Sequence, residues 1–150
     1  MRCGQRQSRL PLLPSRTDRE ECSLREWRVI AIVDDDESVR KAVVLLLQVS
    51  GHRARAYASG QEFLENWSVD KPDCLLLDLQ MPSLSGADVQ RALNRAGAHF
   101  PVVIMTANES PSAREECLRE GAIAYLRKPL DGRLLLNALS FALLCHVGTY

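Results

Sequence analysis

The stretch Cys74-Leu-Leu-Leu-Asp78 is apolar at every position until its last residue, where a carboxylate appears. A short run without polar alternation is typical of a strand that helices cover on both faces, as in a parallel sheet. Because the acid follows the apolar run, we expect Asp78 at the carboxyl end of a central strand. Ligands of open parallel sheets bind beyond these ends, so Asp78 is the first candidate functional residue.

Similar short apolar runs lie on both sides of this stretch and alternate with amphipathic segments. The runs predicted as strands are Val29–Val33, 53–58, 74–77, 101–105 and 122–126. The second of these is the least apolar, which suits an edge position. Alternating strands and helices predict an α/β fold, with five βα units around a five-stranded parallel sheet.

Capping residues mark the helices between these runs. The first helix is predicted over Glu37–Val49, and the pairs Ser59 with Glu62 and Ser85 with Asp88 are predicted capping boxes of the next two. The remaining predicted caps are Gly51, Gly97, Ser110 before Pro111, Gly121 and Asp131. The second to fifth predicted helices therefore each have a capping residue at their start.

The composition limits the size and the partners of the protein. Its 150 residues are 46% hydrophobic, which suffices for one core and is too little for two domains of ordinary size. The 19 basic and 19 acidic residues cancel, so the chain has no electrostatic signature of nucleic-acid binding. Residues 1–28 hold seven Arg and four acids, which leaves 12 basic and 15 acidic residues for a mildly acidic remainder.

The five cysteines show no CxxC spacing. Cys74 and Cys117 lie in a predicted strand and a predicted helix, so reduced core thiols of a cytoplasmic protein fit best. No apolar run approaches the roughly 20 residues of a membrane span. We expect no membrane contact.

Apolar periodicity begins at Arg28. Residues 1–27 mix Arg, Pro, Ser and Glu, and we predict a disordered extension there, with a nucleic-acid-binding arm as the alternative. Residues 28–147 form the predicted domain, and 148–150 a short tail.

Polar residues stand at the ends of four predicted strands. Asp34 and Asp35 end the first, Asp78 the third and Thr106 the fourth, and Lys128 follows the fifth. The carboxyl ends of parallel strands share one edge of the sheet, so these residues should converge on one site.

Three clustered carboxylates repel one another, so such a site calls for a counter-cation. Hard oxygen ligands with room for water suit Mg²⁺. A carboxylate beside this ion, with a lysine and a hydroxyl opposite, is arranged for phosphoryl transfer in which the carboxylate is the nucleophile. The residues alone thus predict that Asp78 becomes an acyl phosphate.

Four blocks of the sequence resemble the signature segments of response-regulator receiver domains of bacterial two-component systems. They are Val33-Asp-Asp-Asp-Glu-Ser-Val-Arg40, Leu77-Asp-Leu-Gln-Met-Pro82 with Gly86, Ile104-Met-Thr-Ala107 and Ala124-Tyr-Leu-Arg-Lys-Pro129. Each block alone is common, but all of them in this order on matching strand ends are specific. The nearest likeness is to nitrogen-fixation and nitrate-type regulators. The resemblance implies a flavodoxin-like, doubly wound (βα)5 fold with strand order 2-1-3-4-5.

The resemblance also implies how the metal and the phosphoryl group are held. Asp78 would accept the phosphoryl group from a sensor histidine kinase. Asp35 would ligate Mg²⁺ directly, Asp34 would help through water, and the backbone carbonyl of Gln80 would supply another ligand. Such a domain is a signalling phosphoacceptor that catalyses only its own phosphorylation and dephosphorylation, rather than an enzyme with a separate substrate.

The response to phosphorylation follows from the same resemblance. Lys128 would pair with the phosphoryl oxygens, and the bond from Lys128 to Pro129 would be cis. Thr106 would hydrogen-bond one phosphoryl oxygen, and Tyr125 would swing inward as Thr106 moves. Gln80 and Asn108 occupy positions that tune the lifetime of the phosphoryl group in this family.

Simpler interpretations exist for single residues. Asp36 is read as a carboxylate at a helix N-terminus rather than a ligand. Thr106 alone could be an ordinary strand residue, and Tyr125 alone an edge-strand aromatic. The histidines at 52, 99 and 146 fall outside the strand-end set, so we assign them no metal or catalytic role.

Other classes of protein fit less well. A phosphatase of the haloacid-dehalogenase type needs a second acid two residues after its nucleophile, where this chain has Gln80. A receiver-like module that only binds proteins and is not phosphorylated would lack Asp78, Asp35 or Lys128, and this chain has all three. A DNA-binding protein would need a helix-turn-helix after the fifth strand, which this chain lacks. The output is therefore expected to be transcription through an absent or separate effector, or protein contacts of a stand-alone receiver.

The last predicted helix has more apolar residues than packing on a sheet requires. Its polar stripe consists only of Arg133, Asn137 and Ser140. The surplus predicts a homodimer surface, strengthened by phosphorylation, that comprises the fourth helix, the fifth strand and this helix. A constitutive dimer and contact with an output domain are the alternatives.

Overall fold

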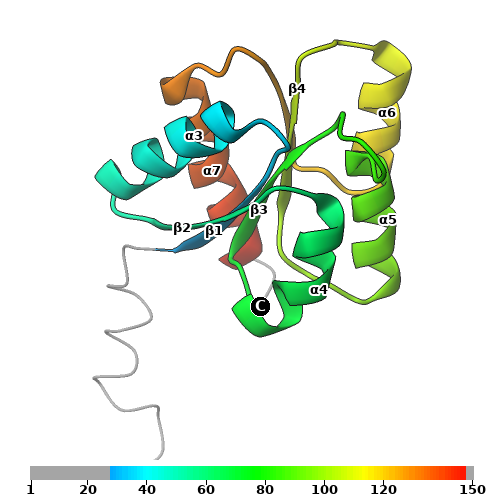
Figure 1. Ribbon diagram of the computed structural model, residues 1–150, viewed down its shortest axis with the longest axis horizontal. Coiled ribbons are helices and arrows are strands. Elements are labelled where there is room, and N and C mark those ends of the chain that lie inside the picture. Colours follow the sequence, from blue (N-terminus) through cyan, green and yellow to red (C-terminus); the bar gives the residue numbers. More distant parts are fainter. Residues whose placement is uncertain (1–27, 148–150) are drawn as a thin grey trace, which may run out of the picture.

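The computed structural model describes residues 28–147, except for the side chains of 146 and 147. Its five parallel strands are arranged in the order β2-β1-β3-β4-β5 (Figure 1). They are β1 (Val29–Val33), β2 (Arg53–Tyr57), β3 (Cys74–Asp78), β4 (Val102–Thr106) and β5 (Ala124–Arg127). The predicted order is confirmed, with β3 at the centre and β2 at an edge.

Helices cover both faces of this sheet. They are α3 (Glu37–Val49), α4 (Gly60–Asp70), α5 (Gly86–Arg95), α6 (Pro111–Arg119) and α7 (Gly132–Val147). Helices α3 and α7 pack on one face, and α4, α5 and α6 on the other (Figure 1). The fold is therefore the doubly wound α/β arrangement that the sequence predicts.

The strands contribute side chains to two apolar clusters, one on each face of the sheet. In β1, Ala31 and Val33 belong to the cluster under α4, α5 and α6, whereas Ile30 and Ile32 belong to the one under α3 and α7. Every residue of β3 is buried. This explains why β3 is apolar throughout rather than at alternate positions.

The two predicted capping boxes differ in the structure. At α5 the box is complete, with reciprocal bonds between Ser85 and Asp88. At α4 the Ser59 hydroxyl accepts from the Glu62 N–H, but Glu62 Oε1 accepts from the N–H of Ala58 at 2.8 Å. The prediction of a full box there was wrong, because the Glu62 side chain reaches one residue beyond the N-cap.

Strand limits also differ from the predictions, by one or two residues. Pro101 precedes β4 because proline has no N–H to donate to the ladder. Strand β5 begins at Ala124 rather than 122 because the Ala122 N–H is still bonded to the Cys117 carbonyl at the end of α6. Strands β3 and β4 extend one residue beyond the predicted apolar runs, to Asp78 and Thr106, which confirms that these two residues end their strands.

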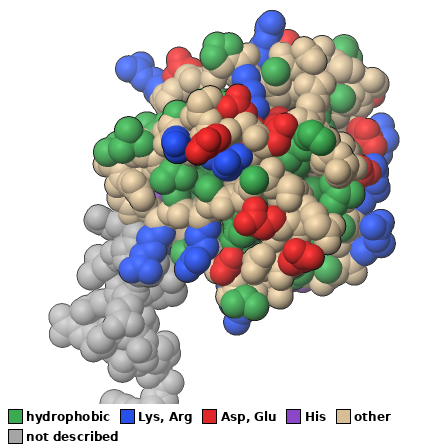
Figure 2. All heavy atoms as spheres, in the orientation of Figure 1, with side chains coloured by type: hydrophobic (Ala, Val, Ile, Leu, Met, Phe, Trp, Pro, Cys, Tyr) green, Lys and Arg blue, Asp and Glu red, His purple; other side chains and the backbone are tan. Residues whose placement is uncertain are grey.

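The cysteines that the structure describes, Cys74, Cys117 and Cys145, are free. Burial raises the pKa of the Cys74 thiol to about 12, so this side chain is an unreactive part of the core. Among residues 28–147, no helix has both the length and the apolar character needed to cross a membrane. On the face shown in Figure 2, acidic and basic side chains are interspersed.

The predictions for 1–27 and 148–150 concern residues outside the described part of the chain, as does the one for the side chain of His146.

Candidate functional site: an aspartate cluster with a lysine

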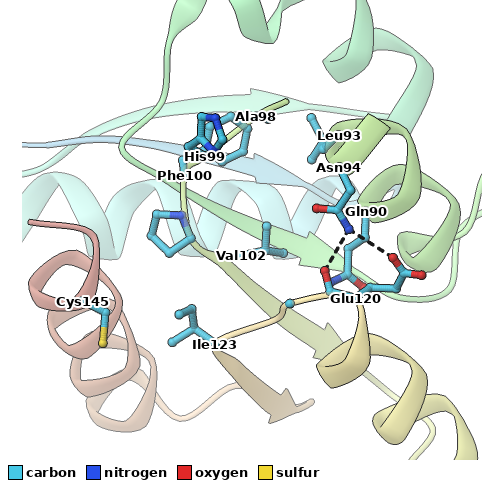
Figure 3. Close-up of a pocket in the computed structure, with 12 residues that line it drawn as sticks. Gln90, Leu93, Asn94, Ala98, His99, Phe100, Val102, Glu120, Ile123 and Cys145 are labelled. Atoms are coloured by element: carbon cyan, nitrogen blue, oxygen red, sulfur yellow. Dashed lines mark hydrogen bonds between the residues drawn. The ribbon is translucent and has the colours of Figure 1, made fainter. Parts of the chain in front are cut away.

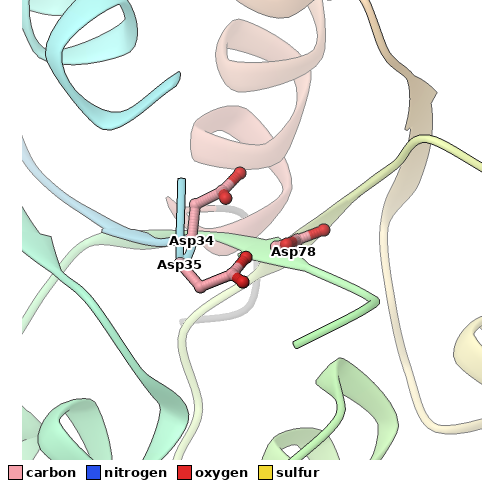
Figure 4. Close-up of side chains that lie close together, drawn as sticks. All are labelled: Asp34, Asp35 and Asp78. Atoms are coloured by element: carbon pink, nitrogen blue, oxygen red, sulfur yellow. The ribbon is translucent and has the colours of Figure 1, made fainter. Parts of the chain in front are cut away.

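Three aspartates meet at the carboxyl end of the sheet. Asp34 and Asp35 follow β1, and Asp78 ends the neighbouring strand β3, whose Leu77 is in register with Val33. One carboxylate oxygen from each aspartate lies within 4.8 Å of the other two (Figure 4). Asp34 is fully buried and Asp78 is only 3% exposed, whereas Asp35 is exposed. The cluster therefore opens to solvent on the side of Asp35.

Lys128 brings a positive charge to this cluster from the loop after β5. Its Nζ atom is 2.6 Å from Asp34 Oδ2 and 3.4 Å from Asp78 Oδ1. The peptide bond between Lys128 and Pro129 is cis, as the family resemblance implied. Asp34 thus holds the lysine beside Asp78, a contact that the sequence did not reveal.

The surroundings of Asp78 favour its protonated form. Burial and the negative charge of Asp34 raise its pKa to about 6, although Lys128 acts in the opposite direction. Burial also opposes the charge on Lys128, but its hydrogen bond to Asp34 and the two nearby carboxylates outweigh this, and the pKa of Lys128 is raised. A second cation near the aspartates would relieve the excess negative charge.

The aspartate cluster fits a small divalent cation. Around octahedral Mg²⁺, neighbouring ligand oxygens lie about 3 Å apart and opposite ones about 4 Å, given metal–oxygen distances of about 2.1 Å. The three carboxylates already lie near this spacing, with one exposed side left for water. Both oxygens of Asp34 have donors, the Asp36 N–H and Lys128, which leaves Asp35 and Asp78 as the freer ligands.

Asp36 has the capping role that the sequence predicts. Its Oδ1 atom accepts hydrogen bonds from the N–H groups of Ser38 and Val39 and from the Ser38 hydroxyl. The bonds from Ser38 lower the pKa of Asp36. It is the N-cap of α3 and is not part of the aspartate cluster.

Thr106 and the two amides form a hydrogen-bonded group beside Asp78. The fully buried Thr106 donates through Oγ1 to the Asn108 carbonyl at 2.9 Å. The Asn108 side chain donates to Gln80 Oε1 at 3.2 Å, which joins the loops after β3 and β4. The N–H of Gln80 lies 3.4 Å from Asp78 Oδ1. The sequence indicated two neutral amides here but not that they bind each other; we call this contact the amide bridge.

Tyr125 lies in β5 and packs against the apolar cluster on the α4, α5 and α6 side. Its hydroxyl is buried without a hydrogen-bond partner in the described part of the chain. The Arg114 guanidinium stands 5.6 Å from the centre of its ring. Its movement on phosphorylation stays a prediction.

The two histidines whose side chains the structure describes lie far from the aspartate cluster. His52 and His99 precede β2 and β4, at the amino ends of these strands, whereas the aspartates lie at the carboxyl ends. The structure thus brings together Asp34, Asp35, Asp78 and Lys128, with Thr106 and Gln80 beside them.

Gly86 lets α5 approach the end of β3. Its N–H donates to the Leu79 carbonyl at 2.8 Å. A Cβ atom added to Gly86 would lie 2.7 Å from the Asp78 carbonyl oxygen and 2.9 Å from Leu79 Cα. The backbone around Asp78 therefore requires glycine at this position.

Comparison with known proteins agrees with this architecture. Residues 30–140 match the model of the response regulator receiver domain family. Response regulator MprA of Mycobacterium ulcerans is 40% identical over 100 residues, which cover 67% of this chain and 43% of the relative. Transcriptional regulatory protein FixJ of Azorhizobium caulinodans is 31% identical over 114 residues, which cover 76% of this chain and 54% of the relative. This chain spans about half the length of these relatives.

Solved structures show the same likeness. The chemotaxis protein CheY4 of Vibrio cholerae has a TM-score of 0.72 at 28% identity, over 77% of this chain and 98% of that one. A receiver domain from Clostridium thermocellum has a TM-score of 0.77 at 26% identity, over 82% and 99%. With the family match, the strand order and the relatives in agreement, the chain belongs to the response-regulator receiver domains of two-component systems.

Proposed function

We propose that this protein takes a phosphoryl group from a sensor histidine kinase onto Asp78 in a Mg²⁺-dependent reaction. The observation that carries the proposal is the convergence of Asp34, Asp35 and Asp78 with Lys128 at one edge of the sheet. An oxygen of Asp78 would form the new bond to phosphorus while the bond from phosphorus to the kinase histidine breaks. The imidazole nitrogen would leave with the electron pair of that bond.

The residues around Asp78 would hold the cation and balance the charge. Asp35 and Asp78 would ligate Mg²⁺ directly, with the Gln80 backbone carbonyl as a further ligand and Asp34 acting through water. The ion would neutralise charge on the phosphoryl oxygens. Lys128, held by Asp34, would pair with one of those oxygens from the other side.

Thr106 and Tyr125 would transmit the effect of phosphorylation to the surface of the domain. The Thr106 hydroxyl would leave the Asn108 carbonyl and donate to a phosphoryl oxygen, and Tyr125 would move into the space this opens. The output we favour is transcription through an effector, because FixJ carries the name of a transcriptional regulatory protein. A stand-alone receiver that acts by protein contacts is the alternative. The cytoplasmic location stays a prediction.

We expect acetyl phosphate to add one phosphoryl group to the protein when Mg²⁺ is present. The reason is that the phosphoacceptor chemistry lies in this chain and needs only a small activated donor. Intact-mass measurement checks this expectation. One sample is incubated with acetyl phosphate and Mg²⁺, and a parallel sample with acetyl phosphate and excess EDTA. Equal labelling with and without EDTA would contradict the need for the metal, and no labelling in either would contradict the proposed function.

We expect opening of the amide bridge to shorten the life of the phosphoryl group. Asn108→Ala removes the donor to Gln80 Oε1, so water reaches Asp78 more easily. A neutral hydrogen bond contributes about 0.5–1.5 kcal/mol, so hydrolysis should accelerate by roughly two- to tenfold. Decay of the phosphorylated mass after removal of acetyl phosphate measures the rate. The control is Ser112→Ala, at an exposed position on α6, and its phosphoryl group should decay at the wild-type rate. A wild-type decay rate in Asn108→Ala would argue against shielding of Asp78 by the amide bridge.

We propose that two copies associate through a surface made by α6, β5 and α7 when Asp78 is phosphorylated. In α7, Leu134, Phe141 and Leu144 are 58%, 56% and 73% exposed, and their spacing places them on one side of the helix. Exposed large apolar side chains in a row are typical of a contact surface. A constitutive dimer and cover by another domain are the alternatives.

We expect sedimentation of the protein to show more dimer when beryllofluoride mimics the phosphoryl group. A contact of about 6 kcal/mol becomes visible at roughly 100 μM protein. Phe141→Lys should abolish the shift, whereas Val69→Lys, at an exposed apolar position on α4, should leave it. A mass that the mimic does not change would rule out phosphorylation-driven association through this surface.

A further inference from the structure

Some side chains of this fold hold a neighbouring element by donating to one of its backbone carbonyls. At the amino end of the sheet, Gln90 and Asn94 of α5 donate to carbonyls at the end of α6 (Figure 3). At the carboxyl end, Nη1 of Arg40 donates to the carbonyl of Asp34 at 2.8 Å. Arg40 lies in the first turn of α3, so its side chain turns back to the loop that carries two of the three aspartates.

The bond from Arg40 satisfies a carbonyl of a buried residue. Asp34 is fully buried, and Arg40 is partly buried beside it. The N–H of Asp34 donates to the Tyr57 carbonyl at 3.2 Å. Its carboxylate accepts from the Asp36 N–H and from Lys128. Without the guanidinium of Arg40, the Asp34 carbonyl would lose a charged donor, and the peptide unit that contains it could turn.

This peptide unit connects Asp34 to Asp35. Its six atoms lie in one plane and include the Cα atoms of both residues, so a fixed carbonyl also fixes where the Asp35 Cα lies. Asp35 is exposed, and packing in the core therefore does not hold its side chain. The place of its carboxylate in the aspartate cluster thus depends on the peptide unit that Arg40 holds.

The positive charge of Arg40 would have the opposite effect on a metal ion. A guanidinium close to the aspartates repels a divalent cation, so its removal would strengthen Mg²⁺ binding if charge alone mattered. Removal of the bond to the carbonyl would weaken Mg²⁺ binding if the bond positions Asp35. The two effects differ in sign and can be told apart by one measurement.

We propose that Arg40 is a positioning residue for the metal, which fixes the peptide unit between Asp34 and Asp35 and so keeps the Asp35 carboxylate beside Asp78. The proposal rests on the Mg²⁺-dependent phosphorylation proposed above. It adds a residue that contacts neither the ion nor the phosphoryl group and acts through the backbone.

The test is a titration of the ¹⁵N-labelled full chain with MgCl₂ in the absence of a phosphoryl donor, followed by backbone NMR shifts. Arg40→Met keeps the aliphatic part of the side chain without the donor. Its Kd for Mg²⁺ should rise about tenfold, the lower end of what loss of a residue that orients a metal ligand costs. The matched control is Lys41→Met, which removes the same charge from the next, exposed position, where Lys41 pairs only with Glu37 on the same helix. Its Kd should equal that of the wild type or be slightly lower.

Phosphorylation by acetyl phosphate gives a second readout that a purely structural role of Arg40 would not change. In Arg40→Met, the Mg²⁺ concentration for half-maximal labelling should rise by the same factor as the Kd. The rate at saturating Mg²⁺ should stay within about twofold of the wild type, because Asp78 and Lys128 are unchanged. A residue that only stabilises α3 would instead lower the urea midpoint in EDTA and leave the Kd as it is.

Two outcomes would overturn the role of Arg40 and leave the proposed function intact. They are a wild-type or lower Kd in Arg40→Met, and an equal rise of the Kd in Lys41→Met. Absence of Mg²⁺ shifts around the aspartates of the wild type would contradict the proposed function, and the role of Arg40 with it. If Arg40→Met does not fold, Arg40→Gln, whose side chain is too short for the same bond, is measured in its place against the same expectation.

Discussion

Asp78→Asn is expected to reduce phosphorylation by acetyl phosphate at least a hundredfold, to about the detection limit of intact-mass measurement. The substitution keeps the size and shape of the side chain, but an amide has no carboxylate oxygen to attack phosphorus. It also replaces one of the two freer carboxylate ligands for Mg²⁺ by a neutral amide, which binds the ion more weakly. The effect should therefore be nearly complete, although the neighbouring side chains stay in place.

The matched control is Asp36→Asn. This exposed carboxylate follows the aspartate pair but caps α3 through its side chain, and asparagine caps helices about as well as aspartate. The Asp36→Asn variant should be phosphorylated by acetyl phosphate to the same extent as the wild type. Similar labelling of Asp78→Asn and the wild type would show that another residue is the nucleophile and would end the proposed role of Asp78.

Unfolding measurements separate a lost nucleophile from a lost fold. The pKa of Asp78 in the folded protein, about 6, lies above its ordinary value because of burial and Asp34. A raised carboxyl pKa means that ionisation destabilises the folded state, and this penalty is present above pH 6 and absent below the ordinary pKa. In EDTA at pH 7, Asp78→Asn should therefore be at least as stable as the wild type, and the difference should shrink as the pH falls toward 4.

Gly86→Ala is expected to lower the free energy of unfolding by about 1–3 kcal/mol and to impair phosphorylation with it. The added Cβ would meet two backbone atoms, the Asp78 carbonyl oxygen at 2.7 Å and Leu79 Cα at 2.9 Å. Backbone atoms cannot turn aside as a side chain does, so α5 or the end of β3 has to move. Glycine is required at position 86 because there is no space for a Cβ atom. Movement of α5 or of the end of β3 would displace the phosphoacceptor Asp78.

Gly132→Ala is the control for this substitution. Its Cβ would contact only the flexible side chain of Leu46, at 3.5 Å, in the first turn of α7. Alanine favours helix over glycine by up to about 1 kcal/mol, so this variant should be neutral or stabilised. Urea unfolding of both variants measures the difference in midpoint. Equal midpoints for Gly86→Ala and the wild type would mean that the loop after β3 adapts without cost.

Much of the fold could be predicted because a strand that is buried on both faces of the sheet is apolar at every position. The unbroken run in β3 indicated a central strand, and the exposed arginines of β2 indicated an edge. The residues that end these strands then located the site, since parallel strands bring their carboxyl ends together. Short-range caps were less reliable, as the bond from Ala58 to Glu62 shows.

Contacts between side chains of different loops could not be predicted. Lys128 lies closer to Asp34 than to Asp78, which depends on the path of the loop after β5. The amide bridge joins residues 28 positions apart, and nothing in the spacing of Gln80 and Asn108 indicates that they meet. Gln90 appears in the sequence as a polar residue on an amphipathic helix, and only the packing of α6 buries it.

The sharing of strands between the two apolar clusters has a consequence for how the molecule comes apart. Strands β1, β3 and β4 each place side chains in both clusters, so neither layer of helices has a core of its own. Loss of one layer would expose the sheet residues that hold the other. The domain should therefore unfold as a single cooperative unit, and amide hydrogens of β1 and β3 should exchange only when the whole domain opens.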